Sequence, residues 1–297
     1  MFISHKSKSN TTSGWVNGFL GVLIFSGSLP ATKVAIMDFD PIFLTVARAS
    51  IAGLLAIIIL FVFKEKRPVS SQLFSLFIVA IGVVVGFPLL TALALQHVTS
   101  AHSIVFLGLL PLTTAIFGVW RGGERPRPAF WVFSVIGSLL VIGFAFLQGV
   151  SASLTGDVLM LAAVLVCGLG YAEGAKLSRI LGGWQVICWA LLISLPAMLI
   201  MTFLFMPISF ANVGVPAWIS LAYVSLFSML IGFIFWYRGL VQGGIAAVGQ
   251  LQLLQPFFGL ALSTSLLGEP VNLLMVAVTI GVIFCVAGSR KFAIKKI

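Results

Sequence analysis

The sequence predicts an all-α membrane protein with ten transmembrane helices, arranged as two five-helix repeats of opposite orientation. Three observations support this prediction: the composition, the apolar segments and a pattern that occurs twice. Hydrophobic residues make up 60% of the 297 residues and charged residues only 8%, against about 25% charged residues in soluble domains. The mean hydropathy is +1.19. A soluble protein of this composition could not cover its core with polar groups, so a helical membrane protein is the class that fits.

Ten apolar segments have roughly the 20-residue length that a helix needs to cross a bilayer. The segments are continuous and do not alternate with polar residues, which excludes a membrane β-barrel. Several connections between them are very short, so neighbouring helices are expected to form antiparallel hairpins. The predicted spans are 15–36, 41–63, 72–95, 101–120, 129–148, 156–176, 183–206, 216–237, 245–267 and 271–288.

The basic residues predict how these helices are oriented. With the N-terminus in the cytoplasm, 15 of the 17 Lys and Arg residues fall at cytoplasmic positions, as the positive-inside rule requires. The opposite loops carry acidic residues, which are Asp38, Asp40, Asp157 and Glu269. We therefore expect a multi-pass protein of the cell inner (plasma) membrane, with cytoplasmic tails at 1–14 and 289–297. The net charge of +10 has the same origin, so it does not indicate binding to nucleic acid.

One pattern occurs in both halves of the chain, at Ala101–Glu124 and at Ala246–Glu269. Each copy is an apolar segment with a proline near its middle and Gly-Glu at its end. Pro111 and Pro256 are 145 residues apart, as are the first and last residues of the two copies. Such gapless coincidences at one offset predict an internal repeat of about half the chain.

The two predicted repeats cover 15–148 and 156–288. Because each contains five spans, the second repeat must enter the membrane upside down relative to the first. A proline in the middle of a membrane helix frees a backbone carbonyl and bends the chain. Pro111 and Pro256 are therefore predicted helix breaks, and paired breaks of this kind point to a binding site between the halves.

The repeated motifs resemble those of the drug/metabolite transporter superfamily, in its ten-helix EamA-like branch. The first half reads ALALQHVTSAHS, PLTTAIFG and GGERP in succession, and the second reads GGIAAVGQLQLLQP and LLGEP. SGSLPATKVA in the first span and the spacing from Pro41 to Arg48 are also similar to the family. Many members carry an aromatic residue at the position of His97, a departure that concerns specificity and not the fold.

The resemblance extends over essentially the whole chain. It implies two five-helix halves around a central cavity, alternating access, and movement of small metabolites, often outward across a bacterial inner membrane. The leading hypothesis is thus a secondary transporter of an amino acid, an amine or a drug-like solute. The alternatives are a membrane-embedded enzyme and a passive channel.

Catalytic motifs are missing from the sequence, which contains no HExxH, GxGD, GxSxG or Walker motif. We therefore predict that the protein is not an enzyme and that it has no catalytic residues. The three cysteines have no metal-ligand spacing, so neither a metal nor a cofactor is expected. The expected partners are a small-molecule substrate and the lipid bilayer, with no nucleic acid, and a homodimer is left open.

Arg48 and three glutamines are candidate cavity residues. Arg48 lies seven residues into the second span, roughly 10 Å deep at 1.5 Å per residue. A charge near the helix centre costs about 2.5–3.5 kcal/mol and usually faces the interior of the bundle. Arg48 has either a substrate contact or a structural role. Gln252 and Gln255 share one helical face before Pro256, with Gln250 on a neighbouring face, and they line the cavity or bond to a neighbouring helix.

Glu173 is the only carboxylate predicted to be buried within a span. It either couples transport to the proton gradient or forms a local ion pair with Lys176, three residues further on. Tyr171 and Trp189 are candidate aromatic walls of the cavity, with simple core packing as the alternative. Glu124 is expected to cap the helix that follows it in the sequence.

Overall fold

The computed structural model describes residues 11–98, 103, 106–147, 153–267 and 273–293. Its first half contains α1 (Thr11–Ser26), α2 (Ser28–Ala35), α3 (Pro41–Val62), α4 (Ser70–Val79), the π-helix η1 (Ala80–Gly86), α5 (Phe87–His97), α7 (Leu110–Gly122) and α8 (Pro128–Leu147). Its second half contains α9 (Leu154–Leu181), α10 (Gly183–Leu204), α11 (Val215–Tyr223), the π-helix η2 (Val224–Ile231), α12 (Gly232–Gly243), α13 (Ile245–Gly249), the 3-10 helix η3 (Gln250–Leu254), α14 (Gln255–Leu267) and α15 (Leu273–Phe292).

Helices are the only regular secondary structure in the described part of the chain, which confirms the predicted fold class. Each predicted span overlaps a described helix or a continuous run of helices, although the first is interrupted by a turn at Gly27. By length and apolar composition, six such runs within the described ranges could cross a membrane, and Pro128–Phe144 is a shorter apolar helix. Glu269, at the end of the second copy of the repeated pattern, lies outside the described residues.

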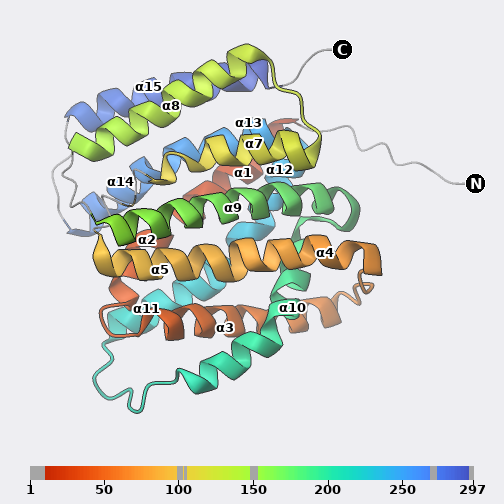
Figure 1. Cartoon of the computed structure of the whole chain (residues 1–297), viewed down its shortest axis with the longest axis vertical. Coiled ribbons are helices and arrows are strands. Elements are labelled where there is room, and N and C mark those ends of the chain that lie inside the picture. Colours follow the sequence, from red (N-terminus) through yellow and green to blue (C-terminus); the bar gives the residue numbers. More distant parts are fainter. Residues whose placement is uncertain (1–10, 99–102, 104–105, 148–152, 268–272, 294–297) are drawn as a thin grey trace, which may run out of the picture.

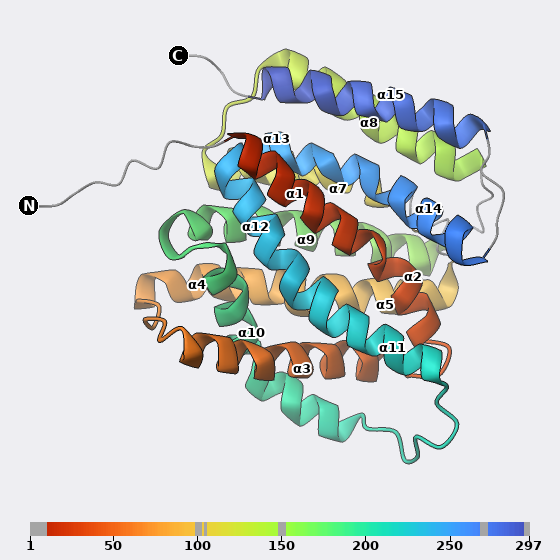
Figure 2. The same ribbon diagram turned by 180° about the vertical axis from the view of Figure 1, so that it is seen from behind.

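The helices lie side by side in one bundle (Figure 1). Helices α8 and α15 pack together along one edge, and α3 and α10 pack together along the opposite edge (Figures 1 and 2). One end of the bundle carries the α3–α4, α7–α8, α9–α10 and α12–α13 connections, and we call it the basic end. The basic residues in or next to these connections are Lys64, Lys66, Arg67, Arg121, Arg125, Arg127, Arg179 and Arg238. The opposite end, the acidic end, carries Asp38, Asp40 and Asp157.

The two halves share the helix breaks in their third and fourth runs. The third run of each half contains a π-helix, and these two segments end 145 residues apart, at Gly86 and Ile231. π-helices are rare and often occur at functional sites, so a matched pair is a structural sign of the repeat. The fourth run breaks at the prolines: Pro111 is in the first turn of α7, and Pro256 is in the first turn of α14, directly after η3.

Packing crosses from one half to the other. Helix α1 packs along α12, whereas α9 packs along η1 and α5, so the first run of each half contacts the third run of the other. Glycines allow the close approach of α1 and α12: a Cβ on Gly239 would lie 2.5 Å from the backbone nitrogen of Gly18. Gly82 approaches Gly170 in the equivalent contact of the other pair. Small residues at such contacts are typical of membrane helix bundles.

Candidate functional site

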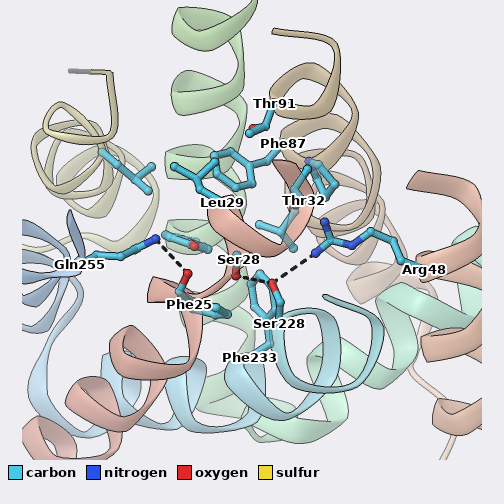
Figure 3. A pocket seen from close by; sticks show the side chains of 14 residues that line it. Phe25, Ser28, Leu29, Thr32, Arg48, Phe87, Thr91, Ser228, Phe233 and Gln255 are labelled. Carbon is cyan, nitrogen blue, oxygen red and sulfur yellow. Dashed lines mark hydrogen bonds between the residues drawn. The ribbon is translucent and has the colours of Figure 1, made fainter. Parts of the chain in front are cut away.

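A cavity lies between the two halves, with lining residues from both (Figure 3). The space inside it that water-sized groups can occupy is about 30 Å³, and the larger volume of about 540 Å³ between its walls includes open solvent. Nearly every run of helices around it contributes a side chain, and both π-helices take part. The lining residues are Phe25, Ser28, Leu29, Thr32, Arg48, Val83, Phe87, Pro88, Thr91, Leu110, Tyr171, Ser228, Phe233 and Gln255.

Arg48 brings a positive charge into this cavity. Helix α3 starts at Pro41 because Asp40 caps it, its Oδ1 accepting the backbone N–H groups of Ile42 at 2.8 Å and Phe43 at 3.0 Å. Two turns later, the Arg48 side chain lies buried, with 6% of its surface exposed. Its Nη2 donates to the Ser228 hydroxyl at 3.2 Å, whereas its Nε has no partner in the described structure. The guanidinium therefore keeps unused donors inside the bundle.

Ser228 joins both halves at the cavity. It lies in the π-helix η2, where its Oγ accepts a hydrogen bond from Ser28 at 2.7 Å as well as the one from Arg48 (Figure 3). Ser28 is the first residue of α2, directly after the turn at Gly27 that separates α2 from α1. The break in the first run and the wide turn of η2 thus place the two hydroxyls within bonding distance.

The broken end of α1 also offers backbone acceptors to the second half. Its last carbonyls have no partner within α1, as at any helix C-terminus. The Tyr223 hydroxyl donates to the Ile24 carbonyl at 2.6 Å, and the Gln255 amide donates to the Phe25 carbonyl at 3.3 Å. Gln255 reaches the cavity from the side opposite Arg48 (Figure 3).

The remaining wall of the cavity is largely aromatic and aliphatic. Phe25, Phe87, Tyr171 and Phe233 contribute rings to it. The Thr91 hydroxyl also lines the cavity, and it is buried without a hydrogen-bond partner among the described residues. A mostly apolar hollow with a few convergent polar groups is the usual form of a small-molecule site.

A comparison with known families decides what kind of protein holds this cavity. The model of the EamA-like transporter family matches residues 12–147 and again residues 154–290. The chain belongs to the EamA-like transporter family. It is therefore a multi-pass membrane transporter, built from two copies of the family's unit.

Individual relatives agree with this assignment to the EamA-like family. The uncharacterized transporter YdeK of Bacillus subtilis (strain 168) is 68% identical over 285 residues, which cover 96% of this chain and 99% of YdeK. The uncharacterized transporter YyaM of the same organism is 23% identical and covers 91% of this chain and 90% of its own length. One solved structure, described only as the crystal structure of a protein, has the same fold, with a TM-score of 0.77 at 18% sequence identity. The match covers 93% of this chain and 98% of the chain in that structure.

Three of the candidate residues predicted from the sequence line the cavity of this EamA-like chain: Arg48, Tyr171 and Gln255. Hydroxyls at Ser28, Thr32, Thr91 and Ser228 were not singled out, because serine and threonine occur throughout the spans. The signals that could have found them are the serine that follows the Gly27 turn and the matching positions of the two π-helices.

The structure does not place Gln250, Gln252 or Trp189 on the cavity. Both glutamines lie in the 3-10 helix η3, which packs against α7 and α15, and they are buried, with 0% and 2% of their surfaces exposed. Their side-chain amides have no hydrogen-bond partners in the described parts of the chain. Trp189 is half-buried on α10 and packs against the core.

Glu173 is fully buried near the basic end, outside the cavity. It forms an ion pair with Lys176 at 3.3 Å and a shorter one with Arg121 at 2.7 Å, and it accepts a hydrogen bond from Ser75 at 2.6 Å. The sequence analysis identified Lys176 but missed Arg121, which is 52 residues away in the chain. The Glu173 carboxylate therefore links α4, α7 and α9.

The expectation that Glu124 caps the helix following it is wrong. Its two carboxylate oxygens accept the backbone N–H groups of Ile245 at 2.6 Å and Ala246 at 2.7 Å, at the start of α13 in the other half. The left-handed turn at Gly123, with φ of 69°, ends α7 just before Glu124. Arg179 adds a pair with Glu124 at 3.5 Å. The cap therefore fastens the fourth runs of the two halves to each other at the basic end.

Proposed function

We propose that this EamA-like protein is a secondary transporter that moves a small metabolite out of a bacterial cell by alternating access to the central cavity. The observation that carries the proposal is the cavity itself, which lies between two repeated halves and contains a buried, incompletely bonded arginine. Ionisable groups inside membrane bundles commonly mark substrate pathways. The outward direction and the plasma membrane follow from what the family resemblance implies and from the bacterial relatives.

Three layers separate the cavity from the basic end. The first is a cluster of buried rings, in which the centroid of Tyr171 lies 5.9 Å from that of Phe233 and 5.4 Å from that of Trp236. The second layer is the ion-pair cluster of Glu173, and the third is the cap of Glu124 on α13. In the proposed mechanism the basic end faces the cytoplasm, so this conformation is closed on the cytoplasmic side.

Opening toward the cytoplasm would then require the two halves to rock about the cavity and to break the outer two layers. Both layers join elements of the two halves, which rocking would separate. The Glu124 cap connects α7 with α13, and the Glu173 cluster connects α4 and α7 with α9. Rigid-body rocking of one repeat against the other is the usual route to alternating access in transporters with inverted repeats. The substrate would contact Arg48, Tyr171 and Gln255, and would be released when the opposite path opens.

The function is tested by flux measurements with purified protein in proteoliposomes. Vesicles preloaded with unlabelled amino acids, organic acids, amines or amides would be assayed for counterflow of the labelled compound. A transporter gives saturable counterflow that responds to an imposed gradient. Flux that rises linearly with concentration would indicate a channel, and a chemically altered solute would indicate an enzyme.

The orientation has a test of its own. Cysteines would be introduced at exposed positions in place of Lys66 at the basic end and Met37 at the acidic end. The native cysteines, Cys167, Cys188 and Cys285, are buried and serve as the unreactive background. In intact cells a membrane-impermeant maleimide should label the Met37→Cys protein and leave the Lys66→Cys protein unlabelled. The reverse pattern would overturn the proposed orientation.

A further inference from the structure

We infer that the transported solute is a small organic acid with a single carboxylate, held by Arg48, and that amines and zwitterions are poor substrates. This inference rests on the proposed function and specifies its substrate class. It is drawn from the charges and donors that surround the cavity.

The Arg48 guanidinium has no anionic partner in the described structure. Three other basic groups differ in this respect, since Arg121 and Lys176 share the Glu173 carboxylate and Lys33 donates to the Leu95 carbonyl at 2.8 Å. A buried charge is costly unless it is paired and hydrogen-bonded. One neutral hydroxyl, that of Ser228, meets little of this requirement, so the site is complete only when an anion enters it.

Four described carboxylates that could in principle pair with Arg48 are already engaged by other groups. Glu173 belongs to its ion-pair cluster and Glu124 caps α13. Asp40 caps α3, and Asp38 accepts the backbone N–H of Gly214 at 2.8 Å. The partner of Arg48 is therefore expected to come from outside the chain.

Arg48 is suited to a carboxylate by its geometry. A guanidinium presents its donors in a planar fork that matches the two oxygens of a carboxylate. In Figure 3, Arg48 and Gln255 approach the cavity from opposite sides, with Ser28 and Ser228 between them. The free space of about 30 Å³ is smaller than such a solute, so the walls would have to move apart to admit it. A carboxylate bound at Arg48 would then leave the far end of the solute next to the Gln255 amide and the apolar body among the phenylalanine rings.

The same lining argues against other charge classes. The described residues that line the cavity include one cation, Arg48, and no Asp or Glu. An ammonium group would therefore meet Arg48 without a carboxylate to balance it, and like charges repel strongly in a site of low polarity. A dianion such as a phosphate monoester would bring two charges to a single cation. One negative charge is the best match.

The test compares solutes of similar shape that differ in charge. The aliphatic set is isocaproate, isocaproamide, leucine and isoamylamine, and the aromatic set is phenylpropionate, phenylpropionamide, phenylalanine and phenethylamine. At pH 7 the acids are anions and the amines are cations. Thermal stabilisation of the wild-type protein in detergent, at millimolar solute, reports binding, and counterflow in proteoliposomes reports transport. This series needs no variant and therefore no assumption about folding.

We expect the acid of at least one set to bind on the order of 30-fold more tightly than its amide, which is the size of effect that a buried charge pair gives. Tighter binding or faster flux of an amide, an amino acid or an amine would overturn the inference while leaving the proposed function intact. Failure of both acids to bind would also overturn it. Absence of flux for every solute in both sets and in the wider panel would count against the proposed function itself.

Two variants locate the effect at Arg48. Arg48→Gln should abolish the preference for the acid over its amide, and Arg48→Lys should retain part of it. Arg238→Gln is the matched control, because Arg238 is an exposed residue at the basic end and away from the cavity. Ser228→Ala, a milder change, should weaken binding of the acid without removing the preference. An unchanged preference in a folded Arg48→Gln protein would overturn the assignment.

Discussion

The Glu124 carboxylate at the end of α7 accepts the backbone N–H of Ile245, at the start of α13, at 2.6 Å. This bond joins the fourth helical run of one half to that of the other, between residues 121 positions apart in the chain. A carboxylate at a helix N-terminus satisfies backbone donors that would otherwise be unpaired and interacts favourably with the helix dipole. Glu124 is therefore positioned to hold the basic end closed.

Replacing Glu124 should loosen this closure. Loss of a helix cap typically costs about 0.5–2 kcal/mol, so we expect Glu124→Ala to lower the melting temperature of the purified protein by several degrees. Residues behind the cap should also become more accessible, which hydrogen–deuterium exchange over α13 would detect. Glu65→Ala is the control, because among the described residues the Glu65 carboxylate accepts one hydrogen bond, from the Gln185 amide at 3.5 Å, and no helix-capping bond. Equal effects of the two substitutions would contradict the role of Glu124.

The Glu173 cluster leads to a prediction about stability and coupling. Glu173→Gln leaves Arg121 and Lys176 without their carboxylate, and hydrogen bonds to charged groups are each worth about 1.5–3 kcal/mol. We expect a less stable protein whose residual flux responds to a pH gradient as the wild type does. Parallel measurements of thermal stability and of flux with and without the gradient check this. If the variant were stable but insensitive to the gradient, Glu173 would be the proton-coupling group.

Glycines at the α1–α12 contact provide a prediction about packing. A Cβ on Gly239 would lie 2.5 Å from the Gly18 nitrogen and 3.0 Å from the Gly14 carbonyl oxygen, both of them backbone atoms. Because the backbone cannot move aside easily, Gly239→Ala should destabilise the protein by about 1–3 kcal/mol. Gly143→Ala is the matched control, since no described atom outside its own helix backbone lies within 4 Å of its added Cβ. A melting temperature that falls equally in both variants would contradict the close contact.

The spans could be predicted from the sequence because hydropathy is a property of consecutive residues. The same is true of Arg48 and Gln255, which stand out as polar groups within apolar segments. Serines do not stand out, since a serine in a membrane helix can bond to its own backbone, as Ser225 does with the Leu221 carbonyl at 2.6 Å. The pairing of Ser28 with Ser228 depends on a turn in one half and a π-helix in the other, and neither follows from local composition.

Long-range polar contacts were also beyond prediction from the sequence. The spacing of three residues pointed to Lys176 as the partner of Glu173, yet the shorter ion pair is with Arg121 on another helix. Similarly, the glutamines near Pro256 could be placed on helical faces only by assuming an α-helix. In the structure Gln252 is buried within the 3-10 segment η3, outside the cavity lining, whereas Gln255 begins α14 and lines the cavity.

The buried amides of Gln250 and Gln252 give the last prediction. Neither side chain has a hydrogen-bond partner in the described structure, and both are almost completely buried. An unsatisfied buried amide costs about 1–3 kcal/mol, so replacing it with an apolar side chain of similar length should not destabilise the protein. We expect Gln252→Met to leave the melting temperature unchanged or to raise it, and to retain flux. Gln255→Met, which removes a cavity group and its bond to the Phe25 carbonyl, should reduce flux. Loss of flux in Gln252→Met with an unchanged melting temperature would instead show that η3 takes part in transport, through a conformation in which its amides find partners.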